Sequence, residues 1–233
     1  IIPEATINRQ ASAAYEQFKS KAKLITKGKK LNEIIKIGKK IETSVTSFFK
    51  NKGEKDPTEN FGWDYILVDN DKIVNAWCMP GGKIAFYSGI LPVAKNEDGI
   101  AAIMGHEIAH AVARHSAERA STAMVTDLGI MALEQLVLGQ RLPQAAGYVR
   151  QFGLDLPFNR SQETEADYMG LIFSSMAGYD INESYKVWER MKEEMEGSGP
   201  PEFFSTHPSP DNRIIKLKEW IPLIKVQYPP IKI

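Results

Sequence analysis

The pentapeptide HEIAH at positions 106–110 constrains this chain more than any other feature of its sequence. It lies in a run of good helix formers that begins after Asn96, a residue suited to cap a helix. Residues four apart on a helix are separated by only about 40° of rotation, so His106 and His110 can both reach one metal ion. Glu107 then stands beside that ion, where its carboxylate can accept a proton from water. The pattern favours a metal-dependent hydrolase over a helix whose histidines only cap or fill space.

A third protein ligand is expected in the segment NRSQETEADYMG, residues 159–170. Glu163 and Asp167 are four apart on a predicted helix and share one face, where two acids repel each other and call for a nearby cation. Zinc meets this need if Glu163 binds it while Asp167 accepts the spare N–H of a ligand histidine. Glu165 is two residues from Glu163, so we expect it to point elsewhere as a solvated charge.

Other histidine ligands are not expected on the first helix. In metzincins the third ligand is a histidine six residues after the second, with a glycine halfway, but this chain has Ser116 and Ala113 there. His115 is nine residues from His106, which amounts to about half a turn of net rotation on a continuous helix. We therefore expect His115 on the opposite face, in a packing or surface role.

The remaining elements are predicted from periodicity and turn residues. Apolar residues at three-and-four spacing predict an amphipathic helix that ends near Lys52 and Gly53, after a less regular helix over about residues 4–25. Three short strands predict a small antiparallel sheet: residues 63–68, 73–79 and 83–88. The chain after Asn96 is predicted to be helical, with breaks near residues 139, 153–157, 178 and 197–201.

These elements predict an α+β fold, mainly helical, in a single domain over residues 1–233. Residues 1–55 are expected to form N-terminal helices that pack on a catalytic core of residues 60–220. Lys and Arg number 29, as do Asp and Glu, so nucleic acid is not an expected partner. Between Lys19 and Lys55, twelve lysines face three glutamates, which allows peripheral membrane association, although solvated helix faces explain them more simply.

Several motifs together resemble those of the gluzincin metallopeptidases related to the CAAX prenyl endopeptidase, with their HtpX-like and BepA-like members. HEIAH is followed some fifty residues later by ETEAD, and the segment NAWCMPGGKI at 75–84 precedes both. Thr206-His207-Pro208 with Arg213 matches a late motif, so the resemblance covers about residues 63–217. Asn159 is a small departure, because many members carry serine there. No stretch approaches 18 apolar residues, which favours the soluble, BepA-like or lipoprotein-like branch.

The resemblance implies a zincin-type domain with a small sheet beside the HExxH helix. It implies one Zn2+ per chain, bound by His106, His110 and Glu163, with Glu107 as general base and Asp167 bonded to a ligand histidine. Two later residues are also implied in catalysis. His207 would either stabilise the oxyanion or occupy the open zinc position as a latency ligand, and Arg213 would hold the Glu163 helix or bind the transition state.

The resemblance also implies where substrate binds. An extended peptide would join the predicted third strand as an additional strand, next to a tight glycine bend. An inner strand with no substrate role is the alternative interpretation. The residues expected to bind substrate are Gly81, Gly82, Lys83, Ile84, Ala85 and Phe86.

The motifs predict a zinc-dependent endopeptidase. The resemblance implies that it cleaves extended or misfolded polypeptides in a periplasmic or cell-envelope setting. The sequence begins at Ile1, so a leader was removed or the sequence was trimmed. A deformylase-type hydrolase with Cys78 as third ligand is one alternative, but it leaves Glu163 and Asp167 unexplained. A chaperone-like or latent zinc-binding module without turnover is another. The physiological substrate and the oligomeric state are left open by the sequence.

Overall fold

The computed structural model describes residues 2–123, 154, 156–208 and 211–232. The helical break predicted near residue 139 lies outside these ranges. Within these ranges four strands form the sheet: β1 (Leu24–Ile25), β2 (Asp64–Val68), β3 (Ala76–Met79) and β4 (Lys83–Tyr87). The helices are α1 (Glu4–Lys21), α2 (Lys29–Lys52), the 3-10 turn η1 (Ser88–Ile90), α3 (Leu91–Ala94), α4 (Glu97–Val112), α7 (Arg160–Met176), α8 (Glu183–Ser198), α9 (Glu202–Thr206) and α10 (Asp211–Gln227). The mainly helical α+β class expected from the sequence is confirmed.

The sheet is mixed, and the antiparallel sheet expected from the sequence is wrong in one strand pair. Its order is β1-β2-β4-β3; β2 and β4 run parallel, and the other two pairs are antiparallel. The chain leaves β2, forms β3, and returns through a tight turn at Gly81 and Gly82, both with positive φ. This turn inserts β4 between its predecessors. The helix predicted over about residues 4–25 ends earlier, at Lys21, and Ala22 is already extended. The residues that follow form β1, which the sequence did not predict.

This strand order changes the expected substrate-binding edge. The strand over Lys83 to Phe86 lies between β2 and β3 and is paired on both sides, so the prediction that it forms an open edge is wrong. The outer strand on this side of the sheet is β3, which also packs against α4. Periodicity predicts that a segment is a strand, but not its neighbours, which depend on contacts across the whole fold.

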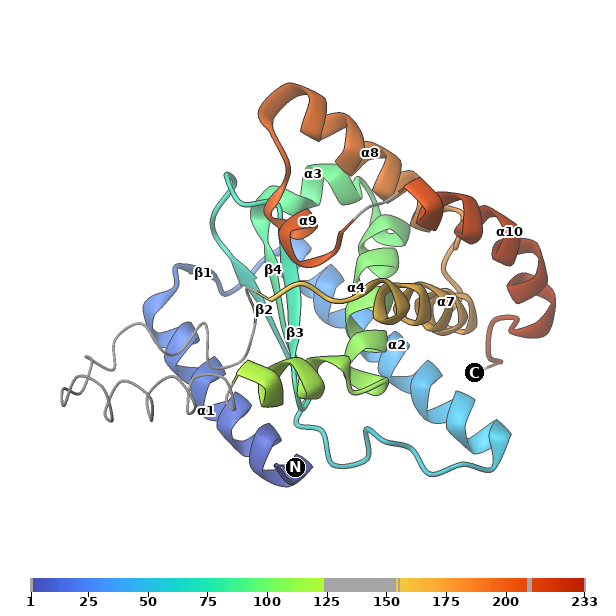
Figure 1. The fold of residues 1–233 in the computed structure, drawn as a ribbon, viewed down its shortest axis with the longest axis horizontal. Coiled ribbons are helices and arrows are strands. Elements are labelled where there is room, and N and C mark those ends of the chain that lie inside the picture. The colour runs from blue at the N-terminus through green and yellow to red at the C-terminus, as the bar shows by residue number, and fades with distance from the viewer. Residues whose placement is uncertain (1, 124–153, 155, 209–210, 233) are drawn as a thin grey trace, which may run out of the picture.

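The sheet is covered on both faces (Figure 1). α1 packs on one face of the sheet, and α2 and α4 lie on the other. α7 packs against α2 and α4. Side chains alternate between these faces along each strand, as the pleat requires. Those that face α1 are Ile66, Val68, Trp77, Met79 and Ala85, whereas Tyr65, Leu67, Cys78, Ile84 and Phe86 belong to the larger core with α2 and α4.

The two helices with the chemically important motifs begin at well-defined caps. The side chain of Asn96 accepts a hydrogen bond of 2.8 Å from the backbone N–H of Gly99, as expected for an α4 cap. Asn159 and Gln162 form a reciprocal capping box at the start of α7. These caps fix where each helix begins and therefore which face each motif residue occupies.

α4 and α7 cross where two glycines meet. A Cβ on Gly105 would overlap Ser174 Oγ and lie 2.9 Å from the carbonyl oxygen of Gly170. A Cβ on Gly170 would lie 3.0 Å from the backbone nitrogen of His106. The absence of both side chains lets the helix backbones approach closely, directly beside the first histidine of HEIAH.

We expect Gly105→Ala to destabilise the protein by about 1–3 kcal/mol, because the added methyl must push α7 away from α4. Thermal or urea unfolding of the purified variant measures this. Gly197→Ala in α8 is the matched control, since its Cβ meets nothing within 4 Å; it should leave stability unchanged or raise it by up to about 1 kcal/mol. Equal stability of Gly105→Ala and the wild type would contradict the close crossing.

Candidate metal centre

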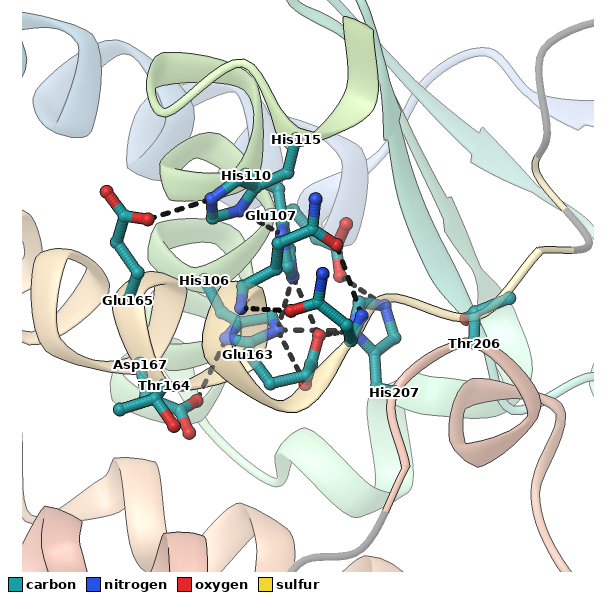
Figure 2. Close-up of polar contacts among 12 residues, drawn as sticks. His106, Glu107, His110, His115, Glu163, Thr164, Glu165, Asp167, Thr206 and His207 are labelled. Atoms are coloured by element: carbon teal, nitrogen blue, oxygen red, sulfur yellow. Dashed lines mark hydrogen bonds and ion pairs between the residues drawn. The ribbon is translucent and has the colours of Figure 1, made fainter. Parts of the chain in front are cut away.

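The histidines of α4 and an acid of α7 converge on one buried point (Figure 2). The Nε2 atoms of His106 and His110 are 3.1 Å apart. Glu163 brings Oε1 to 3.0 Å from Nε2 of His110 and Oε2 to 3.6 Å from Nε2 of His106. The structure thus brings together the three residues that the sequence predicted as ligands.

A third imidazole reaches the same point from the end of α9. Nδ1 of His207 lies 2.9 Å from Oε1 of Glu163 and 3.2 Å from Nε2 of His106. The side chain is buried, and its ring stacks on Phe203 with centroids 4.1 Å apart. One ligand atom from each of the four residues lies within 4.8 Å of all the others: His106, His110, Glu163 and His207.

The spacing of these atoms fits a zinc ion. Ligand atoms that surround zinc tetrahedrally at ordinary bond lengths are about 3.4 Å apart. The contacts given above run from 2.9 to 3.6 Å, and every pair of the four ligand atoms lies within 4.8 Å. Charge points the same way. Burial lowers the pKa of His106, but Glu163 and Asp167 raise it more strongly, to about 9. The two carboxylates beside His106 therefore favour a positive charge at this point of the cluster.

Asp167 lies behind His106, on the side away from the cluster. Its Oδ1 is 3.0 Å from Nδ1 of His106, which leaves Nε2 of that ring directed at the other ligand atoms. Arg213 donates to both oxygens of Asp167, at 2.6 and 2.8 Å, and its Nη1 is 2.5 Å from Oε2 of Glu163. Burial raises the pKa of Asp167, but Arg213 and His106 outweigh it and hold the pKa below its ordinary value. The ion pair of Arg213 with α7, expected from the sequence, is present.

Glu107 is buried next to the four-residue cluster. Its Oε1 lies 3.2 Å from Nε2 of His207. The imidazole of His207 therefore faces the cluster with Nδ1 and Glu107 with Nε2. The structure thus places the predicted general base directly beside the cluster, in contact with His207.

Aromatic rings that sequence reasoning missed enclose the histidines. Phe158 stacks on His110, with centroids 3.7 Å apart and planes 10° apart, and the guanidinium of Arg119 covers Phe158 at 3.9 Å. The backbone N–H of Phe158 donates to the carbonyl of Thr206, which joins this segment to the one that carries His207. Phe158 directly precedes the α7 cap, but no spacing rule in the sequence marks it as part of the site.

His115 is not where the sequence predicted it. α4 ends at Val112, Arg114 adopts a left-handed φ of 66°, and the chain resumes as a helix from residue 115. The rotation argument assumed a continuous helix, so the opposite-face prediction is wrong. Nδ1 of His115 instead lies 3.0 Å from Nδ1 of His110, while the ring stays outside the group of metal-binding atoms.

Two other sequence expectations concern Glu165 and Cys78. The side chain of Glu165 is 56% exposed, as expected of a solvated charge, yet its Oε2 lies 3.0 Å from Nε2 of His115. Cys78 is buried in the core, and its sulfur does not belong to the metal-binding group found among the described residues. Burial raises the pKa of its thiol well above the ordinary value, which opposes the thiolate that a zinc ligand requires. Nothing supports the deformylase-type alternative.

Comparison with known proteins agrees with this site. Residues 38–221 match the family model described as "Peptidase family M48". The chain is 44% identical over 167 residues to the mitochondrial metalloendopeptidase OMA1 of Schizosaccharomyces pombe, which covers 71% of this chain and 48% of that protein. It is 32% identical over 171 residues to the human metalloendopeptidase OMA1, covering 69% and 32% of the two chains.

A bacterial relative is similar at the same level. The β-barrel assembly-enhancing protease of Escherichia coli is 32% identical over 164 residues, which covers 64% of this chain and 32% of the relative. The chain thus spans about half the length of these curated relatives, or less. The ligand set and the family agree that the cofactor is zinc. Since the matched segment contains every residue of the buried cluster, the chain belongs to peptidase family M48.

Proposed function

We propose that this chain is a zinc-dependent endopeptidase that hydrolyses peptide bonds of extended or misfolded polypeptides, with Glu107 as its general base. The observation that carries the proposal is the burial of Glu107 against a four-residue cluster of metal-binding atoms. A structural zinc site has no need of an additional carboxylate, whereas a hydrolase requires one beside the metal.

His106, His110 and Glu163 are the proposed zinc ligands, and Asp167 orients His106 through Nδ1. Bound zinc would supply a Lewis acid that polarises the scissile carbonyl and lowers the pKa of water to about 7. Glu107 takes the proton from the attacking water and returns it to the leaving amine. Arg213 is proposed to hold α7 in place through its contacts with Asp167 and Glu163.

His207 is proposed to hold the enzyme in a latent state. Its Nδ1 lies among the ligand atoms and its Nε2 faces Glu107, so one side chain engages both the fourth ligand position and the general base. α9 supports this arrangement, because the backbone of Val74 just before β3 accepts from Phe203 N–H and donates to Glu202. These contacts fix α9, and with it His207 at its end, to the segment just before β3.

We expect His207→Ala to raise peptidase activity, because the fourth position and Glu107 both become free. Initial rates on an unfolded protein, compared at equal zinc occupancy, measure the change. If His207 instead donates to the developing oxyanion, the same substitution lowers kcat by about 100-fold. Activity equal to that of the wild type would contradict both roles.

Substrate is proposed to bind as an extended strand beside β3. This is the outer strand next to α4, and main-chain pairing there tolerates many sequences, which suits unfolded polypeptides. The carbonyl of Cys78 on β3 accepts a hydrogen bond from Ser116, so pairing would use the remaining groups of the strand. In this arrangement Gly81 to Phe86 do not contact the substrate strand directly. They form the turn and the inner strand that support β3.

The branch and the location of the protein remain proposals. In the described part of the chain every helix is too short or too polar to cross a membrane. The names of the relatives refer to mitochondria in some cases and to β-barrel assembly in others. We retain the BepA-like branch and a cell-envelope location as the predictions, with the mitochondrion as the alternative that the OMA1 names favour. Localisation of the tagged full-length protein distinguishes them.

Turnover of an unfolded protein tests the proposed function. The zinc-loaded chain, and more strongly its His207→Ala variant, should cleave reduced, unfolded casein at internal bonds, lose this activity with a zinc chelator, and regain it when zinc is restored. Product masses from mass spectrometry separate endopeptidase from exopeptidase cleavage. Zinc binding without turnover, both in the wild type and in His207→Ala, would support the latent or chaperone-like module instead.

A further inference from the structure

The spare nitrogen of His110 faces another histidine and not a carboxylate. Nε2 of His110 points into the metal-binding cluster, while its Nδ1 lies 3.0 Å from Nδ1 of His115. Nε2 of His115 in turn lies 3.0 Å from Oε2 of Glu165 (Figure 2). The three side chains form a continuous row from the cluster to the surface, which we name the His110–His115–Glu165 relay.

The positions of the protons in the relay follow from its two ends. Nε2 of His110 must present a lone pair to a metal, so the proton of the neutral ring resides on Nδ1. Nδ1 of His115 must then accept that proton's hydrogen bond, which leaves the His115 proton on Nε2. This N–H points at Glu165, and a carboxylate can only accept. Each of the two contacts therefore has one donor and one acceptor.

The backbone builds this row through the turn after α4. Arg114 in the left-handed region interrupts the helix, and after this turn the ring of His115 lies against that of His110, five residues earlier. A non-glycine residue with this φ is unfavourable and persists where the surroundings require it. His115 is 3% exposed, and the next residue, Ser116, is anchored to the carbonyl of Cys78 on β3.

α7 thus provides a carboxylate for each histidine of α4. Asp167 contacts Nδ1 of His106 directly and is buried. Glu165 serves Nδ1 of His110 through His115, from an exposed position. We propose that His115 and Glu165 are positioning residues that fix the tautomer and the ring orientation of His110 for zinc. This inference rests on the proposed role of His110 as a ligand.

The first test varies His115 and measures the zinc dissociation constant by competition with a chromophoric chelator. His115→Phe keeps a planar ring but removes both nitrogens, and we expect zinc to bind about 10–100-fold more weakly. His115→Asn places an oxygen close to the position of Nδ1 and can still accept from His110, so it should recover most of that loss. A role in packing alone predicts the reverse order, because Phe fills the space better than Asn.

The second test uses Glu165, whose exposed side chain can be replaced without disturbing the core. Glu165→Ala removes the acceptor and should weaken zinc binding by less than about 10-fold, since it is one contact further away. Glu165→Lys places a donor there, which favours the wrong tautomer of His115 and should weaken binding more. Glu118→Ala is the control: this exposed carboxylate accepts a hydrogen bond from Gln162 of α7 without touching the relay, and zinc affinity should not change.

A spectroscopic measurement accompanies the affinities. The visible absorption of the cobalt-substituted protein reports ligand geometry, and it should shift in His115→Phe and Glu165→Lys but not in Glu118→Ala. Wild-type affinity and spectrum in both His115→Phe and Glu165→Lys would overturn the proposal. His110→Ala tests the ligand assignment separately: if it retains zinc at wild-type affinity, the proposed site is wrong, whereas loss of zinc there with unchanged relay variants rejects the relay alone.

Discussion

Glu107→Gln should retain zinc and stability while it loses peptidase activity by about 100- to 10,000-fold, the range typical for loss of a general base. The amide has nearly the shape of the carboxylate, so the buried space beside the cluster stays filled. It cannot accept a proton from water, however, and catalysis loses its first and last proton transfers. Glu107 is well placed for this experiment because it is outside the group of four metal-binding residues.

The measurement is kcat on unfolded casein at equal zinc content, with the zinc content determined by elemental analysis and the fold checked by thermal unfolding. Glu118→Gln provides a matched control, because it makes the same chemical change at an exposed carboxylate and should leave activity intact. If Glu107→Gln lost zinc together with activity, Glu107 would be a ligand or a structural residue. His207→Ala combined with Glu107→Gln should remain inactive, since release of latency cannot replace the base.

Glu163→Ala should reduce zinc from about one equivalent per chain to nearly none at micromolar protein. Glu163 is the only carboxylate in the cluster, and its two oxygens contact the three imidazoles. Without it, the remaining ligands are neutral histidines, and the positive charge of Arg213 at 2.5 Å from the lost oxygen is no longer compensated there. Both changes disfavour a cation.

Elemental analysis after dialysis measures this result, and circular dichroism of the variant beside the metal-free wild type separates loss of metal from loss of fold. Asp167→Ala is a graded comparison: it keeps the ligands but removes the partner of His106, and zinc should bind about 10–100-fold more weakly. Full occupancy and wild-type affinity in Glu163→Ala would show that the ligand assignment is wrong.

Local sequence patterns predicted the parts of the site that lie within single helices. HEIAH and ETEAD each determine which residues share a helix face, and helical geometry alone then directs His106 and His110, or Glu163 and Asp167, to the same side. Asn96 and Gly53 mark helix ends because their side-chain or backbone chemistry acts within a few residues. Such features depend on short-range interactions, and the structure confirms them.

The tertiary structure decided everything that depends on distant contacts. β4 lies inside the sheet because β2 pairs with it, and no alternation pattern encodes a neighbour. Phe158 and His207 reach the cluster from separate segments that only packing brings together. His115 turns back to His110 because Arg114 adopts a strained backbone angle that a helical wheel does not anticipate. The sequence by itself therefore predicted which residues share a helix face, because side-chain direction follows the helical period. Long-range packing brought the two helix faces together and decided the enclosure and orientation of the site.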